Sequence, residues 1–350
     1  MKTLTAVCLA ALAAGAAPAL AATASSEAPK PVYFIFTGYA YPYFAPMAEA
    51  VKQAAAHYPD MTIKIVNANN SASQEIADIN EAVAAGAKGI ILNTIQESVT
   101  ATAERAMKGG VPIVTVDRDV SRPDARVAFV GDNDETLGRE ETQYGVDTLA
   151  KAKVPKPWHV AILQGTLGAS VSIGRLKGAM DVLQPLIDKK EVDVVLNQSA
   201  DFASDKAQAM MSAELAKTTN IQLVVCGNDA MALGVIQALK AHNVTPGEKT
   251  YVVGADAQPE SMDAIKAGTQ LDTVTHAPFV EAYWAVEAMS AYLKNGEKPP
   301  EAKFPHGDII IPMTLVDKAN VGQIAAWGTP EEIPPLPYGQ AQAFKVTSGK

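Results

Sequence analysis

Short apolar runs alternate with segments of helical period along most of this chain, and this alternation constrains the fold more than any other feature. The apolar run 32–36, for example, precedes a segment from Phe44 to Tyr58 in which apolar residues recur on one helix face. The pattern pauses at the proline-containing stretch 153–157 and then starts again. Buried strands separated by helices form parallel sheets that helices cover. We therefore predict an α/β protein with two parallel sheets, one from each series.

The predicted strands are 32–36, 61–66, 89–92, 111–116 and 126–130 in the first series, and runs that begin near 159, 192, 221, 250 and 271 in the second. A helix over 280–293 and a strand near 309 follow the second series. The residues alone leave open which sheet these two elements join. The tail from Asn320 onward is rich in proline, and we expect residues 331–350 to lie extended over the surface.

The first residues have the features of a secretory signal peptide. Lys2 supplies a positive charge, residues 4–17 are apolar and small, and residues 18–21 form a small-x-small cleavage site. A membrane anchor is disfavoured, because the apolar run is shorter than the roughly 20 residues that a span needs. A lipoprotein anchor is disfavoured because Cys8 lies inside the run. We therefore expect residues 1–22 to be removed and the mature protein to be periplasmic.

Composition and motifs exclude several kinds of partner and site. The formal net charge is −9 and the chain has no basic stripe, so nucleic acid is not an expected partner. Removal of the signal peptide leaves Cys226 alone, so no intramolecular disulfide can form. The five histidines lack the spacing of metal ligands, and the Walker, G-x-G-x-x-G and G-x-S-x-G motifs are absent. We therefore expect no metal, no cofactor and no catalytic residue.

Polar and aromatic side chains follow most of the predicted strands. In open parallel sheets, ligands bind beyond the carboxyl ends of the strands, so these side chains should converge from both series. Carboxylates accept hydrogen bonds from hydroxyls, guanidinium groups donate them, and aromatic rings pack against sugar rings. The candidates are Tyr41, Tyr43, Phe44, Asn93, Asp117, Arg118, Phe202, Asn228, Asp256 and His276. Each alone could be an ordinary strand cap, but together they indicate a site for a sugar or polyol.

Five stretches, in order and with matching spacing, make the chain resemble the ribose-binding-like, type I periplasmic sugar-binding proteins of ABC transporters. The galactofuranose-binding branch of that family looks most similar. The stretches are 114–118 (VTVDR), 163–170 (LQGTLGAS) with Arg175, 199–202 (SADF), 227–234 (GNDAMALG) and 253–256 (VGAD). The resemblance extends from about residue 32 to residue 312.

The resemblance implies a two-lobed fold in which a three-stranded hinge joins two sheets flanked by helices. It assigns residues 31–132 plus 277–305 to the N-terminal lobe and 133–276 plus 306–330 to the C-terminal lobe. It also implies a protein that captures a monosaccharide or polyol between the lobes and delivers it to a membrane permease. Because such a clamp must open, we expect a monomer. A periplasmic receptor for a signalling molecule would have the same fold and remains an alternative.

The family's ligand-binding residues fall on matching positions of this chain. Its Asp–Arg pair falls on Asp117 and Arg118, and its second-lobe Arg, Asn and Asp fall on Arg175, Asn228 and Asp256. Asn93 matches the Asn after the third strand, and His276 stands where the family has Gln or Asn at the hinge. The loop with Tyr41, Tyr43 and Phe44 is richer in phenols than the family's usual loop.

A secreted sugar hydrolase or isomerase is the competing function from another class. Asp117 and Asp256 would then form its acid–base pair. Because Arg118 and Arg175 would favour the ionised carboxylates, we consider this function disfavoured.

Overall fold

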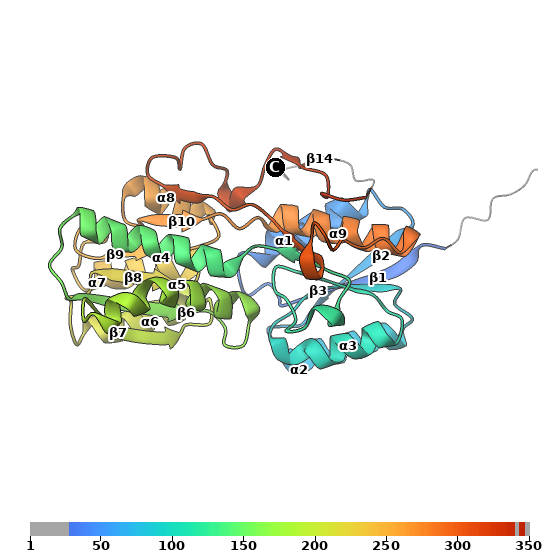
Figure 1. Ribbon diagram of the computed structural model, residues 1–350, viewed down its shortest axis with the longest axis horizontal. Helices are drawn as coiled ribbons and strands as arrows, with labels where there is room; N and C mark the ends of the chain where they lie inside the picture. The colour runs from blue at the N-terminus through green and yellow to red at the C-terminus, as the bar shows by residue number, and fades with distance from the viewer. Residues whose placement is uncertain (1–27, 340–342, 347–350) are drawn as a thin grey trace, which may run out of the picture.

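The computed structural model describes residues 28–339 and 343–346. The predicted signal peptide, residues 1–22, lies outside the described residues. Two six-stranded sheets, each flanked by helices, form two lobes side by side (Figure 1). The prediction of an α/β fold with two parallel-dominated sheets is therefore confirmed.

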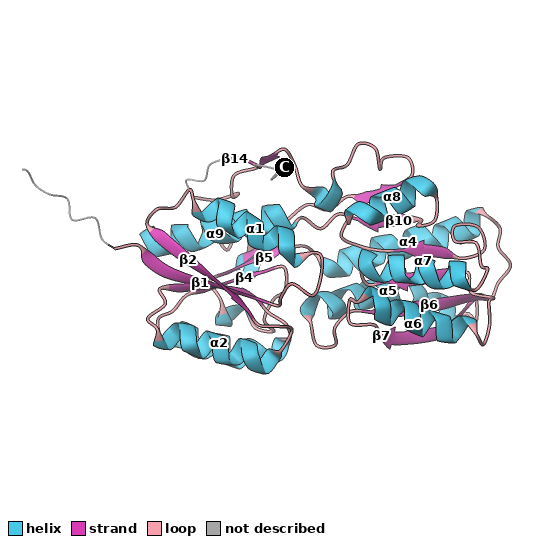
Figure 2. Cartoon of the chain, turned by 180° about the vertical axis from the view of Figure 1, so that it is seen from behind, coloured by secondary structure: helices cyan, strands magenta, loops and turns pink. Residues whose placement is uncertain are grey.

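The first lobe is built on a wholly parallel sheet with the strand order β11-β5-β4-β3-β1-β2. Helices α1 and α9 cover one face of this sheet, and α2 and α3 cover the other (Figure 1 and Figure 2). The elements are β1 (Lys30–Phe36), α1 (Phe44–Ala55), β2 (Met61–Asn67), α2 (Ala72–Ala84), β3 (Gly89–Asn93), α3 (Thr100–Lys108), β4 (Ile113–Val116), β5 (Ala128–Gly131), α9 (Pro278–Asn295) and β11 (Asp308–Ile310).

The second lobe has the strand order β12-β10-β9-β8-β6-β7, in which only the edge strand β12 is antiparallel. Its elements are α4 (Asp134–Lys151), β6 (Trp158–Gln164), α5 (Ser170–Asp188), β7 (Val192–Ser199), α6 (Ser204–Leu215), β8 (Leu223–Cys226), α7 (Asp229–Ala241), β9 (Tyr251–Val253), α8 (Pro259–Ala267), β10 (Asp272–Val274) and β12 (Leu315–Asp317). Short 3₁₀ turns span Glu97–Val99, Pro123–Ala125, Pro305–Gly307 and Ala326–Gly328, and β13 (Glu332–Ile333) pairs with β14 (Phe344–Lys345).

Local sequence explains several boundaries. Ser71 caps α2, because its side chain accepts a hydrogen bond from the Gln74 backbone N–H at 3.3 Å. Asn228 caps α7 in the same way through Met231, at 3.0 Å. Strand β4 begins only at Ile113, after Pro112, whose nitrogen cannot donate to a ladder. None of the helices among the described residues is both long enough and apolar enough to cross a membrane.

Three segments connect the lobes: 132–133 between β5 and α4, 275–277 between β10 and α9, and 311–314 between β11 and β12. The last crossing corrects the predicted lobe boundary, which assigned residues from 306 onward to the second lobe. Strand β11 instead pairs in parallel with β5 and extends the first sheet. The physical reason is that Ile309, which is fully buried, completes the core beside β5.

The tail also differs from the expectation. Its backbone is extended and bears the short β13–β14 pair, but its apolar side chains are part of the core rather than lying on the surface. Ile333, Leu336, Tyr338 and Phe344 are buried in the same cluster as residues of α1 and α9. The prolines prevent a helix here, but they do not prevent these four side chains from packing.

Candidate functional site

A small pocket lies between the lobes, where the carboxyl ends of strands from both sheets meet. It encloses about 30 Å³, which is room for a water molecule or two rather than for a sugar ring. Ten of the eleven predicted residues line it, together with Val171. The lining residues are Tyr41, Tyr43, Phe44, Asp117, Arg118, Val171, Arg175, Phe202, Asn228, Asp256 and His276.

Asn93 is the predicted residue that does not reach the pocket. It lies behind Asp117, and its amide nitrogen donates to Asp117 Oδ2 at 2.6 Å and to the Val116 carbonyl at 3.1 Å. Its own Oδ1 accepts from the backbone and the hydroxyl of Thr37. Asn93 therefore orients Asp117 rather than offering its amide to a ligand.

Arg118 is the polar group in the pocket with the most unused hydrogen-bonding capacity. Its Nε and Nη1 are buried and have no hydrogen-bond partner among the residues that the structure describes. The guanidinium carbon lies 5.3 Å from the ring centre of Phe44 in the first lobe and 5.2 Å from that of Phe202 in the second. Nε is 3.6 Å from Asp117 Oδ2, too long for a hydrogen bond. Donors in this position can bind ligand hydroxyls between two aromatic faces.

Arg175, by contrast, uses all three of its nitrogens within the protein. Nε donates to Asp134 at 2.9 Å, Nη1 to the Gly227 carbonyl at 2.8 Å and to Asp256 at 3.0 Å, and Nη2 lies 2.8 Å from His276 Nδ1. Burial lowers the pKa of Arg175, but the carboxylates of Asp256 and Asp134 outweigh burial and raise it. Arg175 is therefore permanently charged, and it fixes the positions of Asp256 and His276.

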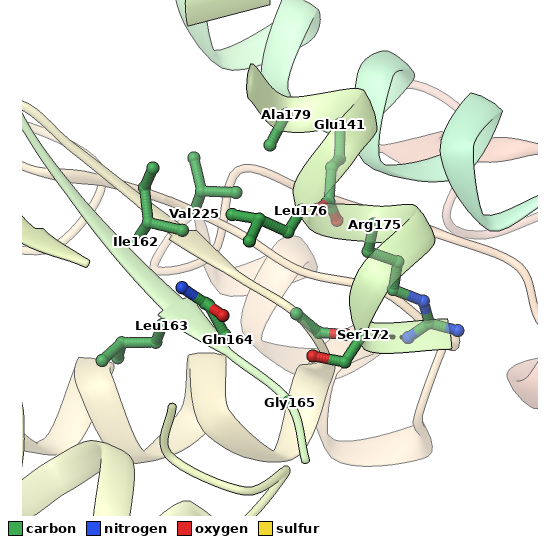
Figure 3. Close-up of a pocket in the computed structure, with 11 residues that line it drawn as sticks. Glu141, Ile162, Leu163, Gln164, Gly165, Ser172, Arg175, Leu176, Ala179 and Val225 are labelled. Carbon is green, nitrogen blue, oxygen red and sulfur yellow. Dashed lines mark hydrogen bonds between the residues drawn. The ribbon is translucent and has the colours of Figure 1, made fainter. Parts of the chain in front are cut away.

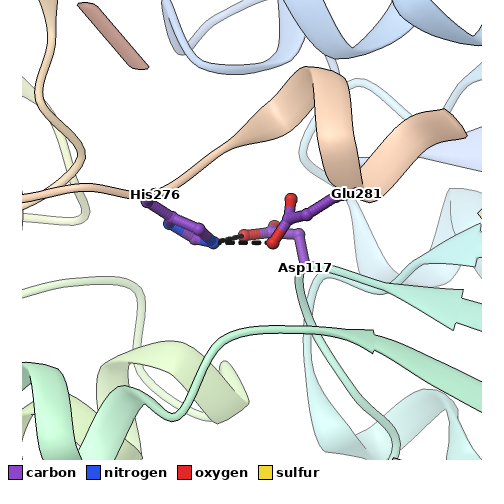
Figure 4. A group of neighbouring side chains, drawn as sticks. All are labelled: Asp117, His276 and Glu281. Atoms are coloured by element: carbon purple, nitrogen blue, oxygen red, sulfur yellow. Dashed lines mark hydrogen bonds and ion pairs between the residues drawn. The ribbon is translucent and has the colours of Figure 1, made fainter. Parts of the chain in front are cut away.

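His276 connects the two lobes through hydrogen bonds (Figure 4). Its Nε2 lies 2.9 Å from Glu281 Oε1 and 3.3 Å from Asp117 Oδ1, and Tyr43 donates to the other oxygen of Glu281 at 2.7 Å. The Tyr43 ring also packs against the imidazole, with ring centres 4.6 Å apart.

The protonation of this group is set by burial and by crowded carboxylates. Burial lowers the pKa of His276, but Glu281 and Asp132 reverse the effect and hold it well above its usual value. A guanidinium can only donate, so the Arg175 contact needs a lone pair on Nδ1. If Nδ1 carried a proton as well, it would have to donate to Asp256 Oδ1, 3.3 Å away, instead of accepting from Arg175. His276 can therefore either accept the hydrogen bond from Arg175 as a neutral imidazole or carry a positive charge, but it cannot do both. Burial raises the pKa of Glu281 to about 7 although His276 opposes it.

Asp117, His276 and Glu281 are also the described residues whose ligand atoms could surround a metal ion, since these atoms lie within 4.8 Å of one another. Two fixed cations stand beside them. Arg175 lies 2.8 Å from the imidazole, and Arg118 lies 3.6 Å from Asp117. This arrangement suits hydrogen bonding among side chains better than a divalent cation, which the guanidinium groups would repel.

Two buried carboxyl groups of the site escaped the sequence analysis. Asp132 directly follows β5, so the same strand-end reasoning would have found it. Its Oδ2 lies 3.6 Å from His276 Nε2, and burial raises its pKa well above the usual range. Glu281 lies in the first turn of α9, where no strand precedes it, and the sequence carries no comparable signal for it.

One argument from sequence about Asp117 was wrong. The neighbouring arginine was expected to favour its ionised form, but burial outweighs both His276 and Arg118 and raises the pKa of Asp117. The backbone of Asp117 also adopts a left-handed conformation with φ of +62°, which is unusual for a residue other than glycine. Strain of this kind is typical of functional sites.

A second, smaller cavity of about 10 Å³ lies inside the second lobe, beside Arg175 (Figure 3). Apolar side chains, including Ile162, Leu176 and Val225, line much of it. Burial raises the pKa of the adjoining Glu141 well above its usual range. At its size the cavity is just large enough for one water molecule, and it offers no room for a ligand.

Comparison with known proteins gives consistent matches over most of the chain. Residues 32–298 match the family described as periplasmic binding protein domain. The ribose import binding protein of Bacillus subtilis is 29% identical over 258 residues, 73% of this chain and 79% of the relative. The galactofuranose-binding protein of Escherichia coli is 26% identical over 283 residues, 78% of this chain and 86% of the relative.

Among solved structures, the Caulobacter myo-inositol binding protein bound to myo-inositol is similar, with a TM-score of 0.76 and 25% identity. The match covers 85% of this chain and 96% of that structure.

Proposed function

Because the chain belongs to the family of periplasmic binding protein domains, we propose that it is a periplasmic protein that binds a monosaccharide or polyol between its lobes and delivers it to an ABC transporter permease. The predicted family resemblance is thereby confirmed. The names of the relatives, import binding proteins for ribose and a binding protein for galactofuranose, support the transport role and the ligand class. The solved relative with bound myo-inositol extends that class to polyols.

The observation that carries this proposal is the buried guanidinium of Arg118, which lies between an aromatic ring of each lobe and whose Nε and Nη1 have no hydrogen-bond partner among the described residues. A buried donor without an acceptor is costly, about 1–3 kcal/mol or more for a charged group. Ligand hydroxyls would supply the missing acceptors, and the rings of Phe44 and Phe202 would contact the apolar face of a sugar. A ligand that meets both lobes in this way stabilises their closed arrangement.

The size of the pocket supports a clamp that opens. With about 30 Å³ available, a sugar can enter only if the lobes separate. Hydrogen bonds between the lobes would break as they part. The Glu97 backbone N–H donates to the Gly168 carbonyl at 2.9 Å, Gln96 donates to Leu167 at 3.0 Å, and the Asp119 backbone N–H donates to the Ser170 hydroxyl at 2.9 Å.

We further propose binding without catalysis. Asp117 and Asp256, the candidate acid–base pair, are both held as hydrogen-bond acceptors. Asn93 occupies one oxygen of Asp117, and Arg175 and His276 contact the same oxygen of Asp256. Such fixed acceptors suit recognition of hydroxyl groups.

A thermal-shift screen of residues 23–350 against pentoses, hexoses, furanoses, tetritols and inositols tests the proposal. A ligand at 100 times its Kd adds about 2.7 kcal/mol to the free energy of unfolding, a shift that melting curves resolve readily. The Arg118→Ala variant is the matched control and should show a clearly smaller shift at the same ligand concentration. If no sugar or polyol raises the melting temperature of the wild type, the proposed ligand class is wrong.

A further inference from the structure

The C-terminal segment returns from the second lobe to the first and connects them a fourth time, beside the three hinge crossings. Figure 1 shows it in dark red, passing over both lobes from β10 and α8 toward α9, and Figure 2 shows the same path from behind. We call residues 321–338 the strap. We propose that the strap restrains the opening of the two lobes and thereby favours the closed, ligand-binding arrangement. This inference rests on the proposed clamp function.

One end of the strap is fixed to the second lobe. Val321 is buried in a small cluster with Met262 and Ile265 of α8. The Trp327 backbone N–H donates to the Ala257 carbonyl at 2.6 Å. This end therefore moves with the second lobe.

The strap also runs close against the hinge. A Cβ atom built on Gly328 would lie only 2.9 Å from the Cβ of Thr275, in the crossing segment that leads to α9, and Gly328 has φ of +57°. The backbone can approach the crossing this closely only because glycine has no side chain.

The other end is fixed to the first lobe. The Trp284 indole N–H donates to the Pro334 carbonyl at 2.8 Å, and the Leu336 backbone N–H donates to the Glu287 carboxylate at 3.1 Å. Ile333 is fully buried among residues of α1 and α9, and Leu336 nearly so. This end therefore moves with the first lobe.

Only five residues, 328–332, separate Trp327, whose backbone is hydrogen-bonded to the second lobe, from Ile333, the first buried anchor in the first lobe. A chain of that length spans at most about 16–18 Å when fully extended. Pro330 within it and Pro334 just beyond it narrow the accessible backbone conformations further. Lobe separation is thus limited by a short, stiff connection.

The strap also touches the binding site. Trp327, held by the second lobe, packs edge-on against Tyr43 of the first lobe with ring centres 5.6 Å apart. Tyr43 in turn lines the pocket and donates to Glu281. Opening the lobes has to separate this aromatic pair or stretch the strap, and either change opposes opening.

The test lengthens the strap and leaves both anchors intact. A flexible Gly/Ser insertion of about eight residues between Thr329 and Pro330 adds roughly 16 Å of reach. The control carries the same insertion between Lys189 and Lys190, an exposed turn of the second lobe. Small-angle scattering of the sugar-free proteins should show a larger radius of gyration for the strap insertion than for the wild type or the control. Equal radii for all three would overturn the proposal.

If the strap insertion does not fold, Trp327→Ala is the second variant, because it keeps the strap's length and its backbone anchors and removes the ring that packs against Tyr43. It too should expand the sugar-free protein, and an unchanged radius would overturn the proposal.

The strap insertion should also bind a sugar from the screen more weakly. Its Kd should rise about tenfold for each tenfold fall in the fraction of sugar-free molecules that are closed. An unchanged affinity despite a larger radius would overturn the claim that the strap favours binding. The sugar-free scattering needs no ligand. If no sugar or polyol binds but the strap insertion expands the protein, the proposed ligand class fails and the strap stands.

Discussion

Replacing Arg118 with alanine should abolish tight sugar binding while leaving the free protein almost as stable as the wild type. The reason is that Nε and Nη1 of Arg118 have no hydrogen-bond partner within the described protein. Its other contacts are the ion pair with Asp117 at 3.6 Å and aromatic rings at 5.2–6.0 Å, and removing a buried guanidinium also removes its desolvation penalty. These two contributions oppose each other, so the free energy of unfolding should change by no more than about 1 kcal/mol.

The effect on affinity should be much larger. Each charge-assisted hydrogen bond to the ligand contributes about 1.5–3 kcal/mol, and 1.4 kcal/mol corresponds to a tenfold change in Kd. Loss of one such bond weakens binding about ten- to a hundredfold, and loss of two weakens it further. Arg118→Lys should recover only part of this, because an ammonium group cannot reproduce the planar arrangement of guanidinium donors.

Arg175→Ala should behave in the opposite way. Sequence alone treats the two arginines as equivalent, but Arg175 neutralises Asp134 and Asp256 in a network whose side chains are at most 12% exposed. Removing one partner of a buried ion pair costs about 3–5 kcal/mol. The variant should therefore unfold at distinctly lower denaturant concentration, whether or not a sugar is present.

Isothermal titration calorimetry with the sugar selected by the screen, together with chemical unfolding, separates the two effects. Arg105→Ala is the control, because Arg105 is exposed on α3 and does not line the pocket, and it should match the wild type in both measurements. The reasoning is refuted if Arg118→Ala binds normally, or if it destabilises the free protein as much as Arg175→Ala.

Three further predictions concern other parts of the molecule. Burial raises the pKa of Glu75 to about 8, from its ordinary value of 4.5 in the unfolded chain. Between these two pH values the unfolded chain gives up the proton more readily than the folded protein, so the free energy of unfolding falls as the pH rises from about 4.5 to 8. At 1.36 kcal/mol per unit, Glu75→Gln should raise the free energy of unfolding at pH 8 by up to about 4–5 kcal/mol and change little at pH 4. Unfolding curves at both pH values measure this gain, and Glu81→Gln, at an exposed position, is the control. An equal gain in the free energy of unfolding at pH 4 and at pH 8 would contradict the prediction. Gly165→Ala should weaken sugar binding measured by calorimetry, because the added Cβ would lie 1.9 Å from the Phe202 ring and displace that ring. An unchanged affinity would show that the Phe202 ring does not contact the ligand. Ser170→Ala removes an interlobe hydrogen bond and should weaken the sugar affinity by about 1 kcal/mol, because the ligand dissociates faster. Stopped-flow measurements give both rates, and a slower association rate with unchanged dissociation would contradict this explanation.

The strand-end reasoning located the pocket well because it depends on topology rather than on side-chain detail. Asp117, Asn228 and Asp256 each follow a parallel strand, and the carboxyl ends of parallel strands share one edge of a sheet. Two such edges facing each other bring the residues together whatever the exact lengths of the helices. Locating Arg175, inside α5, depended on the family resemblance instead.

The hydrogen-bonded groups behind the pocket could not be predicted in the same way. Glu281 reaches His276 only because α9 returns to the first lobe after the second crossing and presents its first turn to the hinge. That orientation depends on the packing of α9 against α1, which the sequence of α9 alone does not predict. The tail illustrates the same limit, because its prolines correctly excluded a helix while the burial of Ile333 and Leu336 depends on a surface formed by α1 and α9.

The balance of charge around the pocket favours a neutral ligand over a charged one. Two carboxylates and two guanidinium groups line it, with Asp256 paired to Arg175 at 3.0 Å and Asp117 beside Arg118 at 3.6 Å. A uronate would bring a negative charge toward Asp117 and Asp256, and an amino sugar would bring a positive charge toward Arg118. Burying an uncompensated ion costs several kcal/mol, whereas each hydroxyl of a neutral sugar can both donate to a carboxylate and accept from a guanidinium. We therefore expect calorimetry to show at least tenfold weaker binding when the selected sugar is replaced by its uronic acid or its amino derivative. Equal or tighter binding of either would mean that further charges, such as the carboxyl groups of Asp132 or Glu281, decide the specificity.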